Sequence, residues 1–327
     1  MSAFETTEVY PGIHLIKVPL PDNPLKFLNS YLIEDSDRPL LVDVGFNHAV
    51  CENALRGALD SFGLKCADVD VLFTHAHPDH AGCIERIWDE SMTLYGNFES
   101  FRDICSVNEM QETIYVPLMN VVLDDARARR QSCGKEIPVE FIPLNIKAPV
   151  TYVGEGDAIN RGSFSFSVIE TPGHEDHHIC LYDKKAKIVI IGDHVLERIT
   201  PNISSFLLET DKLGQFFDSL DKVRDLDVDL VLPGHADPFT HLAKRVDELK
   251  AHHEGRLAEM VELVGDGHHD LIDITAHAHW KYPNWQNWDT TQKYFSLGET
   301  LAHLVHEVHA SRLKLTICGT SVNFYLA

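Results

Sequence analysis

The sequence has no long apolar run, no closely spaced cysteine pair and a shortage of basic residues. No apolar stretch among the 327 residues approaches the roughly 18 that a membrane-spanning helix needs. The acidic start, residues 1–8, lacks the basic and apolar regions of a signal peptide. The seven cysteines are scattered, odd in number and without a Cys-x-x-Cys pair, which is typical of reduced thiols. Together these absences predict a cytoplasmic protein with no membrane partner.

Basic side chains are outnumbered by acidic ones, 28 to 50, and the formal net charge is -22. Binding to nucleic acid depends largely on Lys and Arg side chains that neutralise phosphates, so this balance opposes a nucleic-acid partner. Basic residues cluster only at 127–130 and 184–187, and both clusters fit solvated turns or helix faces. We therefore expect a small-molecule substrate.

One short stretch, residues 74–80, is by contrast dense in potential metal ligands: His75, His77, Asp79 and His80. It follows an apolar run, residues 69–73, that is typical of a buried strand, and it precedes a predicted helix. A strand end that runs into a helix start holds side chains more rigidly than a free loop does. Burying such a cluster of imidazoles and carboxylates without a cation would be costly. The pattern therefore predicts a metal site.

Three further candidate ligands stand next to glycines later in the chain: His174, Asp193 and His235. Each ends or follows an apolar, strand-like run, at 166–169, 188–191 and 230–232 respectively. The ends of such strands can converge on one edge of a sheet. With the first four side chains, this set suits two metal ions lying side by side.

These motifs resemble those of the metallo-β-lactamase-fold hydrolases over residues 8–240. The resemblance implies an α+β fold in which two sheets are enclosed by helices, an αββα sandwich. It also implies that His75, His77 and His174 hold the first metal ion. Asp79, His80 and His235 would hold the second ion, and Asp193 would bridge the pair. Asp43 matches the buried aspartate that lies behind the ligands in this family.

The domain organisation is predicted as a catalytic domain, residues 1–264, and a C-terminal module, residues 265–327. A mostly helical insert at about 97–147 either caps the metals or serves packing or a dimer contact. The predicted order of helix, helix and hairpin near the C-terminus resembles a small winged-helix-like module found in one branch of these hydrolases, carried here by residues 298–304. The module is poor in Lys and Arg, so we expect it to support the catalytic domain or a homodimer contact.

Other histidines and the tryptophans are expected to have structural roles. The second His-x-His pair, His277 and His279, lacks a neighbouring Asp-His and a preceding strand, so we expect it at the surface or in packing. We expect His252, His253 and Arg256 to be exposed on a long helix over 241–264, and His303 to lie in a solvated stripe. The loop at 280–288 holds three of the four tryptophans, which either line the substrate pocket or pack the module.

The ligand set predicts hydrolysis by a metal-bridging hydroxide, because two adjacent divalent ions lower the pKa of a shared water towards neutrality. Asp79 is both a ligand and a candidate proton shuttle. His194, directly after Asp193, either reaches the oxyanion as a catalytic group or packs. Imidazole and carboxylate ligands suit zinc, iron or manganese, and zinc is the default expectation.

The expected substrate is a small ester-like acyl compound, a thioester or a lactone. The region that corresponds to the glutathione site of related thioesterases shows no clear basic cluster. One alternative is a phosphodiesterase or ribonuclease of the same fold. Another is a non-catalytic metal-binding regulatory module, which the complete ligand set argues against.

Overall fold

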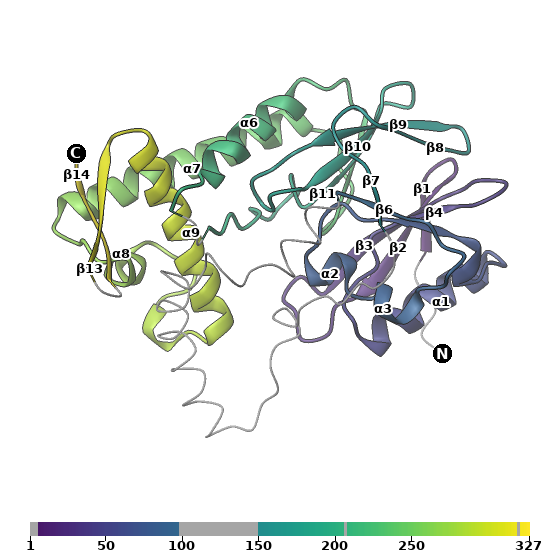
Figure 1. Cartoon of the computed structure of the whole chain (residues 1–327), viewed down its shortest axis with the longest axis horizontal. Helices are drawn as coiled ribbons and strands as arrows, with labels where there is room; N and C mark the ends of the chain where they lie inside the picture. Colours follow the sequence, from purple (N-terminus) through teal and green to yellow (C-terminus); the bar gives the residue numbers. More distant parts are fainter. Residues whose placement is uncertain (1–5, 98–149, 206–207, 319–320) are drawn as a thin grey trace. The chain divides into compact units, whose positions relative to one another are not determined.

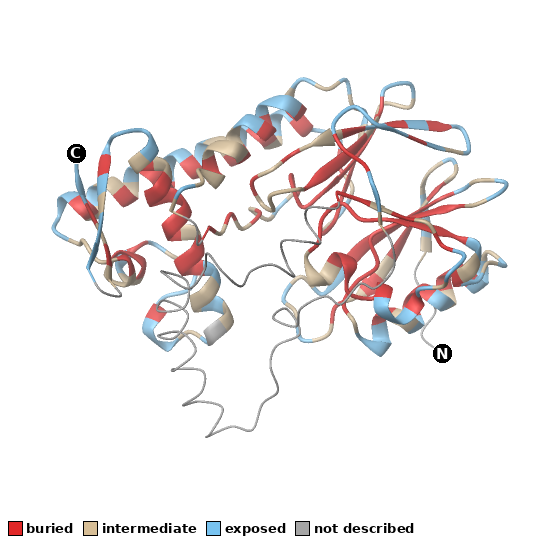
Figure 2. Cartoon of the chain, in the orientation of Figure 1, coloured by how far each residue is buried: buried red, intermediate tan, exposed pale blue. Residues whose placement is uncertain are grey.

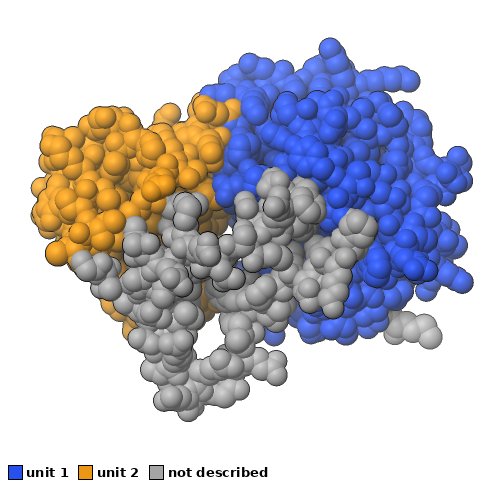
Figure 3. Space-filling view, in the orientation of Figure 1, with its two compact units in different colours: residues 1–105, 138–201, 219–245 blue, residues 106–137, 202–218, 246–327 orange. Residues whose placement is uncertain are grey.

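The computed structural model describes residues 6–97, 150–205, 208–318 and 321–327 (Figure 1). The chain forms two compact units, shown in different colours in Figure 3. Unit 1 comprises residues 1–105, 138–201 and 219–245, and unit 2 comprises residues 106–137, 202–218 and 246–327. The helical insert predicted at about 97–147 lies almost wholly outside the described residues, so its structure and its role as a cap stay predictions. In the described part of the chain, no helix is long and apolar enough to cross a membrane.

Unit 1 contains a seven-stranded and a five-stranded sheet. The first sheet runs in sequence order: β1 (Thr6–Tyr10), β2 (Ile13–Pro19), β3 (Phe27–Ile33), β4 (Leu40–Val42), β5 (Asp70–Leu72), β6 (Leu94–Gly96) and β7 (Val150–Tyr152). Strands β1 to β4 are antiparallel neighbours, and β4 to β7 are parallel. The second sheet has the order β12 (Leu230–Pro233), β11 (Ile188–Gly192), β10 (Ile179–Asp183), β9 (Phe164–Glu170) and β8 (Ala158–Arg161).

The two sheets pack face to face through one apolar core. It contains Tyr31, Val42 and Leu72 from the first sheet, and Phe166 and Ile190 from the second. Because side chains alternate along a strand, the neighbouring residues of the first sheet face the other way. There they form a second core with helix α1 (Ala49–Ser61), whose buried stripe lies inward while its outer face is exposed (Figure 2).

On the other side, helix α6 (Lys212–Arg224) is tied to the end of β9. Ser219 Oγ donates a hydrogen bond to Pro172 O (2.8 Å), and Lys222 Nζ donates one to Glu170 O (2.9 Å). The outward residues of β11, Val189 and Ile191, are fully buried. The expected α+β architecture of two sheets with helices outside is confirmed.

Unit 2 has its own core, built from helix α7 (Leu242–Gly265), helices α8 (Leu271–His277) and α9 (Thr290–His309), and the hairpin β13 (Leu313–Cys318) and β14 (Ser321–Leu326). Helix α9 begins at a capping box in which Asp289 and Gln292 satisfy each other's backbone N–H groups. The order of helix, helix and hairpin is the expected one. The predicted domain boundary after residue 264 stays a prediction.

The tryptophan-rich segment packs within unit 2. Trp285 is buried in the core, and Trp280 and Trp288 pack against it. Each indole N–H donates a hydrogen bond inside this unit, to Ser296 Oγ, Thr275 O and Pro283 O respectively. These contacts support the packing alternative.

Three expectations about exposure were wrong. His253 on α7 and His303 on α9 are both fully buried, with 3.1 Å between His253 Nδ1 and His303 Nε2. Arg256, one helical turn further along α7, is also buried, and its guanidinium lies 4.5 Å from the centre of the Trp280 ring. The polar stripes of α7 and α9 face each other. The hydrophobic periodicity of either helix sequence does not predict packing of this kind.

We predict that Phe324→Ala lowers the free energy of unfolding by about 3–5 kcal/mol, because the change leaves a cavity in the core of unit 2. Phe324 is fully buried, whereas its neighbour on β14, Tyr325, is 40% exposed. Urea denaturation followed by tryptophan fluorescence measures the loss. Tyr325→Ala, the matched control, should cost less than half as much, and equal losses would contradict the packing described here.

Candidate metal centre

The candidate ligands lie where strands of both sheets end. The loop that holds His75 to His80 follows β5 and leads into the short helix α2 (Pro78–Ala81). His174, Asp193 and His235 follow β9, β11 and β12. Strand β10 is antiparallel to both β9 and β11, and β12 is parallel to β11. The C-terminal ends of β9, β11 and β12 therefore meet at one edge of the second sheet.

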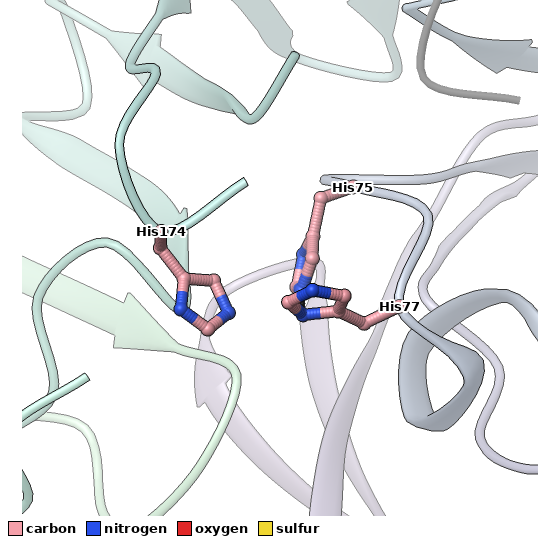
Figure 4. A group of neighbouring side chains, drawn as sticks. All are labelled: His75, His77 and His174. Atoms are coloured by element: carbon pink, nitrogen blue, oxygen red, sulfur yellow. Dashed lines mark hydrogen bonds between the residues drawn. The ribbon is translucent and has the colours of Figure 1, made fainter. Parts of the chain in front are cut away.

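The structure brings all seven predicted ligands together in three overlapping groups: His75, His77 and His174; His75, His80 and Asp193; and Asp79, His80 and His235. Within each group the potential ligand atoms all lie within 4.8 Å of one another. Figure 4 shows the first group, with the imidazoles of the β5 loop and of the turn after β9 pointing towards one another.

The spacing of the ligand atoms suits cations at their centre. In a tetrahedral site with metal–nitrogen distances of about 2.0–2.1 Å, neighbouring ligand atoms lie about 3.3–3.4 Å apart. His80 Nε2 lies 3.3 Å from His235 Nε2, which in turn lies 3.4 Å from Asp79 Oδ2. His75 Nε2 lies 3.0 Å from His77 Nδ1. These separations fit shared coordination of a metal ion.

A buried carboxylate, Asp43, orients two of the imidazoles. Thr74 donates to it twice, through its backbone N–H (2.8 Å) and its hydroxyl (2.7 Å). Because the hydroxyl proton is used there, Thr74 Oγ1 accepts the N–H of His75 Nδ1 (3.0 Å). His80 Nδ1 also donates to Asp43 (2.8 Å). His75 is thus left with a lone pair on Nε2, and His80 presents one there once its Nε2 proton is lost; in both residues Nε2 faces the other ligands.

Asp43 adopts an uncommon backbone conformation for a residue other than glycine, with φ at 58°. The conformation is held on both sides, because Asp43 N donates to Leu72 O (3.0 Å) and Val44 N donates to His80 O (2.7 Å). Such strain persists where surrounding contacts over-determine the backbone, often at functional sites. Here it turns the carboxylate of Asp43 beneath the metal-ligand loop.

The loop that carries His235 is held by strand β3 of the opposite sheet. His235 Nδ1 donates to Phe27 O (2.9 Å), so Nε2 is the ring nitrogen that faces the site. Asn29 Nδ2 donates to Pro233 O (2.9 Å), and Tyr31 Oη donates to the same carbonyl (2.7 Å). Because both sheets contribute to it, the site depends on their packing.

The buried carboxylates of the site favour the binding of protons or metal ions. Burial alone would lower the pKa of His80, but Asp193, Asp43 and Asp79 outweigh it and raise the pKa well above the usual value. His235 responds in the same way, and its pKa rises to about 10. Asp193 Oδ1 is buried and, within the described residues, accepts no hydrogen bond. Either protons or metal ions can balance the negative charge of these carboxylates. The imidazole and carboxylate ligands fit zinc, iron or manganese.

One residue of the site, His178, was not among the residues predicted from the sequence. It is fully buried, and it bonds Thr171 and the backbone of Asp193 through its two ring nitrogens. The order and direction of the strands could have indicated the position of His178. His178 directly precedes β10, and an antiparallel β10 starts at the edge where β9 and β11 end.

His194, predicted as a catalytic group, is fully buried, and the centre of its ring lies 6.1 Å from that of His178. It belongs to none of the three groups of converging ligand atoms among the described residues. Burial lowers its pKa to about 3, so its ring is neutral. A direct catalytic role for His194 stays a prediction.

A fourth cluster of this kind lies in unit 2 and consists of His268, Asp273 and His277. His268 Nδ1 lies 2.7 Å from Asp273 Oδ2, and His277 Nδ1 lies 2.9 Å from the backbone oxygen of Asp273. Since a carbonyl oxygen only accepts, His277 carries its proton on Nδ1. Ordinary hydrogen bonds therefore account for this cluster, and His279 is not part of it.

Comparison with known proteins identifies the family. The profile described as "Metallo-beta-lactamase superfamily" matches residues 24–96 and 106–235. Two solved structures match over nearly the whole chain, each at 25% identity. One is a beta-lactamase domain protein from Burkholderia ambifaria, with a TM-score of 0.81 over 100% of this chain and 95% of that one. The other is a metallo-beta-lactamase family protein from Thermus thermophilus, with a TM-score of 0.77 over 98% and 100%.

Among curated proteins, the probable metallo-hydrolase YqjP of Bacillus subtilis is 27% identical over 67% of this chain and 70% of its own. Acyl-coenzyme A thioesterase MBLAC2 of Bos taurus is 23% identical over 64% and 74%. A hydroxyacylglutathione hydrolase of Francisella tularensis is 34% identical, but over only 25% of this chain and 31% of its own. The chain belongs to the metallo-β-lactamase superfamily, as its motifs predicted, and is a metal-dependent hydrolase.

We predict that metal binding at pH 7.5 releases at least two protons. The raised pKa values of His80 and His235 mean that both carry a proton in the metal-free protein, and each must lose it to present a lone pair. Metal affinity should therefore rise with pH through the neutral range. Titration calorimetry in buffers of different ionisation enthalpy counts the protons, and a heat independent of the buffer would contradict the prediction.

Proposed function

We propose that this hydrolase is dinuclear and acts on small ester-like acyl substrates, thioesters or lactones. The position of Asp193 is the observation that supports a site for two metal ions. Its Oδ2 lies 3.8 Å from His174 Nε2 on one side and 3.4 Å from His235 Nε2 on the other. Its Oδ1 lies 3.5 Å from His80 Nε2. One carboxylate thus stands between the two sets of ligands, as a bridging ligand would.

The proposed assignment follows from the groups already described. His75, His77 and His174 would hold one ion, Asp79, His80 and His235 the other, and Asp193 would bridge them. When bound, two such ions lower the pKa of a shared water and polarise the acyl carbonyl. Zinc is the expected metal, with iron or manganese as alternatives, because spacing alone does not select among them.

Asp79 is the residue proposed to move the proton. Burial alone would raise the pKa of the Asp79 carboxyl group. The neighbouring His80 and His235 have the larger effect together and lower this pKa to about 2. Asp79 is therefore ionised at neutral pH. Its side chain is 16% exposed, whereas those of His80 and His235 are inaccessible. The carboxylate thus reaches the open side of the site, where it could pass the proton to a leaving group.

The acyl class is supported by two observations. The relatives include an acyl-coenzyme A thioesterase and a hydroxyacylglutathione hydrolase, both of which by name act on thioesters. The net charge of -22 disfavours long polyanions. Glutathione thioesters in particular are not indicated, because the matching segment covers only 25% of the chain.

We also propose a cytoplasmic location and a catalytic domain of residues 1–264 followed by a module that supports it or a homodimer contact. All five cysteines in the described part of the chain are free thiols, four of them buried, in keeping with a reducing compartment.

Initial rates on lactones, acyl thioesters and aryl phosphodiesters test the proposed substrate class. The metal-loaded protein should prefer a carbonyl substrate. His77→Ala should lower kcat/KM on that substrate by about 100- to 1000-fold, because losing a ligand costs several kcal/mol of metal-derived stabilisation. A preference for phosphodiesters would contradict the acyl assignment and favour a phosphodiesterase or ribonuclease of the same fold.

The proposed catalytic role of His194 has a separate test. If this residue acts on the reaction, His194→Phe should lower kcat by about tenfold or more while metal content and melting temperature stay near those of the wild type. Steady-state kinetics, metal analysis and thermal unfolding measure the three quantities. A lower melting temperature with unchanged kcat would contradict the catalytic role and show that His194 serves only in packing.

A further inference from the structure

His178 joins three segments that carry candidate ligands. Its Nε2 accepts the backbone N–H of Asp193 (3.2 Å), and its Nδ1 lies 2.7 Å from the hydroxyl of Thr171, at the start of the turn that carries His174. The next residue, Ile179, donates its N–H to Thr74 O (2.9 Å), next to His75. The centres of the His178 and His75 rings lie 5.1 Å apart.

The hydrogen bonds fix the protonation of this ring. A backbone N–H can only donate, so His178 Nε2 must be the acceptor and Nδ1 must carry the proton. That proton is donated to Thr171 Oγ1. The Thr171 hydroxyl is then free to donate to Cys180 Sγ, 3.3 Å away. With both nitrogens used in this way, His178 is not itself a metal ligand.

The approach of β11 to this ring is close enough to require glycine at position 192. A methyl group on Gly192 would lie 2.5 Å from His178 Nε2 and 2.9 Å from Thr74 Oγ1, and its φ is +50°. The backbone just before Asp193 is therefore pressed against His178 on one side and Thr74 on the other. This contact fixes where the carboxylate of Asp193 can lie.

We propose that His178 is a positioning residue: by accepting the Asp193 N–H it sets the bridging carboxylate between the two metal ions. The inference rests on the proposed dinuclear function. It assigns His178 a role through the backbone of a ligand rather than through the metal or the substrate. Partners that orient metal ligands typically change metal affinity about 10- to 100-fold when they are removed.

The test is a Co²⁺ titration of the metal-free full chain, followed by visible absorption, on three variants. His178→Phe keeps a buried ring but has no acceptor for the Asp193 N–H. It should bind at least one of two Co²⁺ ions about 10- to 100-fold more weakly than the wild type and with an altered spectrum. His178→Gln offers a side-chain carbonyl to the same N–H and should recover most of the affinity and the wild-type spectrum. Thr171→Val removes the partner of Nδ1 and should fall between them.

His253→Phe is the matched control, because His253 is equally buried but belongs to unit 2 and to none of the groups of candidate ligands among the described residues. It should leave both Co²⁺ affinities and the spectrum unchanged. Wild-type Co²⁺ binding in His178→Phe, or no recovery in His178→Gln, would overturn the proposal whatever the melting temperatures. If His178→Phe does not fold, Thr171→Val decides, and unchanged binding in that variant overturns it.

The same titration distinguishes failure of the proposed dinuclear function from failure of the proposed role of His178. A wild-type protein that binds fewer than two Co²⁺ ions would contradict the proposed dinuclear function and this inference with it. Two tightly bound ions in the wild type, with variants of His178 that bind equally well, would overturn the role of His178 alone.

Discussion

The carboxylate of Asp43 accepts hydrogen bonds from Thr74 and His80, at the two ends of the loop that carries four of the seven candidate ligands. Through Thr74 it also fixes the tautomer of His75. These hydrogen bonds shape the loop and direct the Nε2 atoms of His75 and His80 towards the other candidate ligands. Since Asp43 lies immediately after β4, the position of this carboxylate depends on the first sheet, and the geometry of the site is inherited from the fold.

The remaining ligands come from the second sheet, so the site exists only because the two sheets pack together. Strand β3 of the first sheet holds the His235 loop through Phe27, Asn29 and Tyr31. Side chains of Tyr31 and Leu232 also belong to the core shared by both sheets. The apolar interface thus has a functional consequence: it sets the distance between two halves of a metal centre.

The metal-ligand loop could be predicted from the sequence because its ligands are close together and follow a recognisable buried strand. His174, Asp193 and His235 were predictable for a similar reason, since each stands beside a glycine at the end of an apolar run. His178 carries no such local mark. Its place depends on β10 running antiparallel to its neighbours, which brings the start of that strand to the edge where the others end.

The buried His253 and His303 could not be foreseen for another physical reason. Each lies on a helix whose polar face would ordinarily be solvated. The packing of α7 against α9, with Phe216 and Phe217 of α6 against His253, buries the pair. Hydrophobic periodicity reports which face of a helix is apolar. It does not report which polar side chains find a partner, and here the hydrogen bond between two imidazoles replaces water.

We propose that Asp193 lies between two metal ions. Anomalous diffraction from crystals of the zinc-loaded protein, recorded on both sides of the zinc absorption edge, would locate these ions. This arrangement predicts two peaks about 3.5–4 Å apart, one beside His75, His77 and His174, the other beside Asp79, His80 and His235. A single peak in the site, or a peak at His268 and His277 with none beside Asp193, would contradict it.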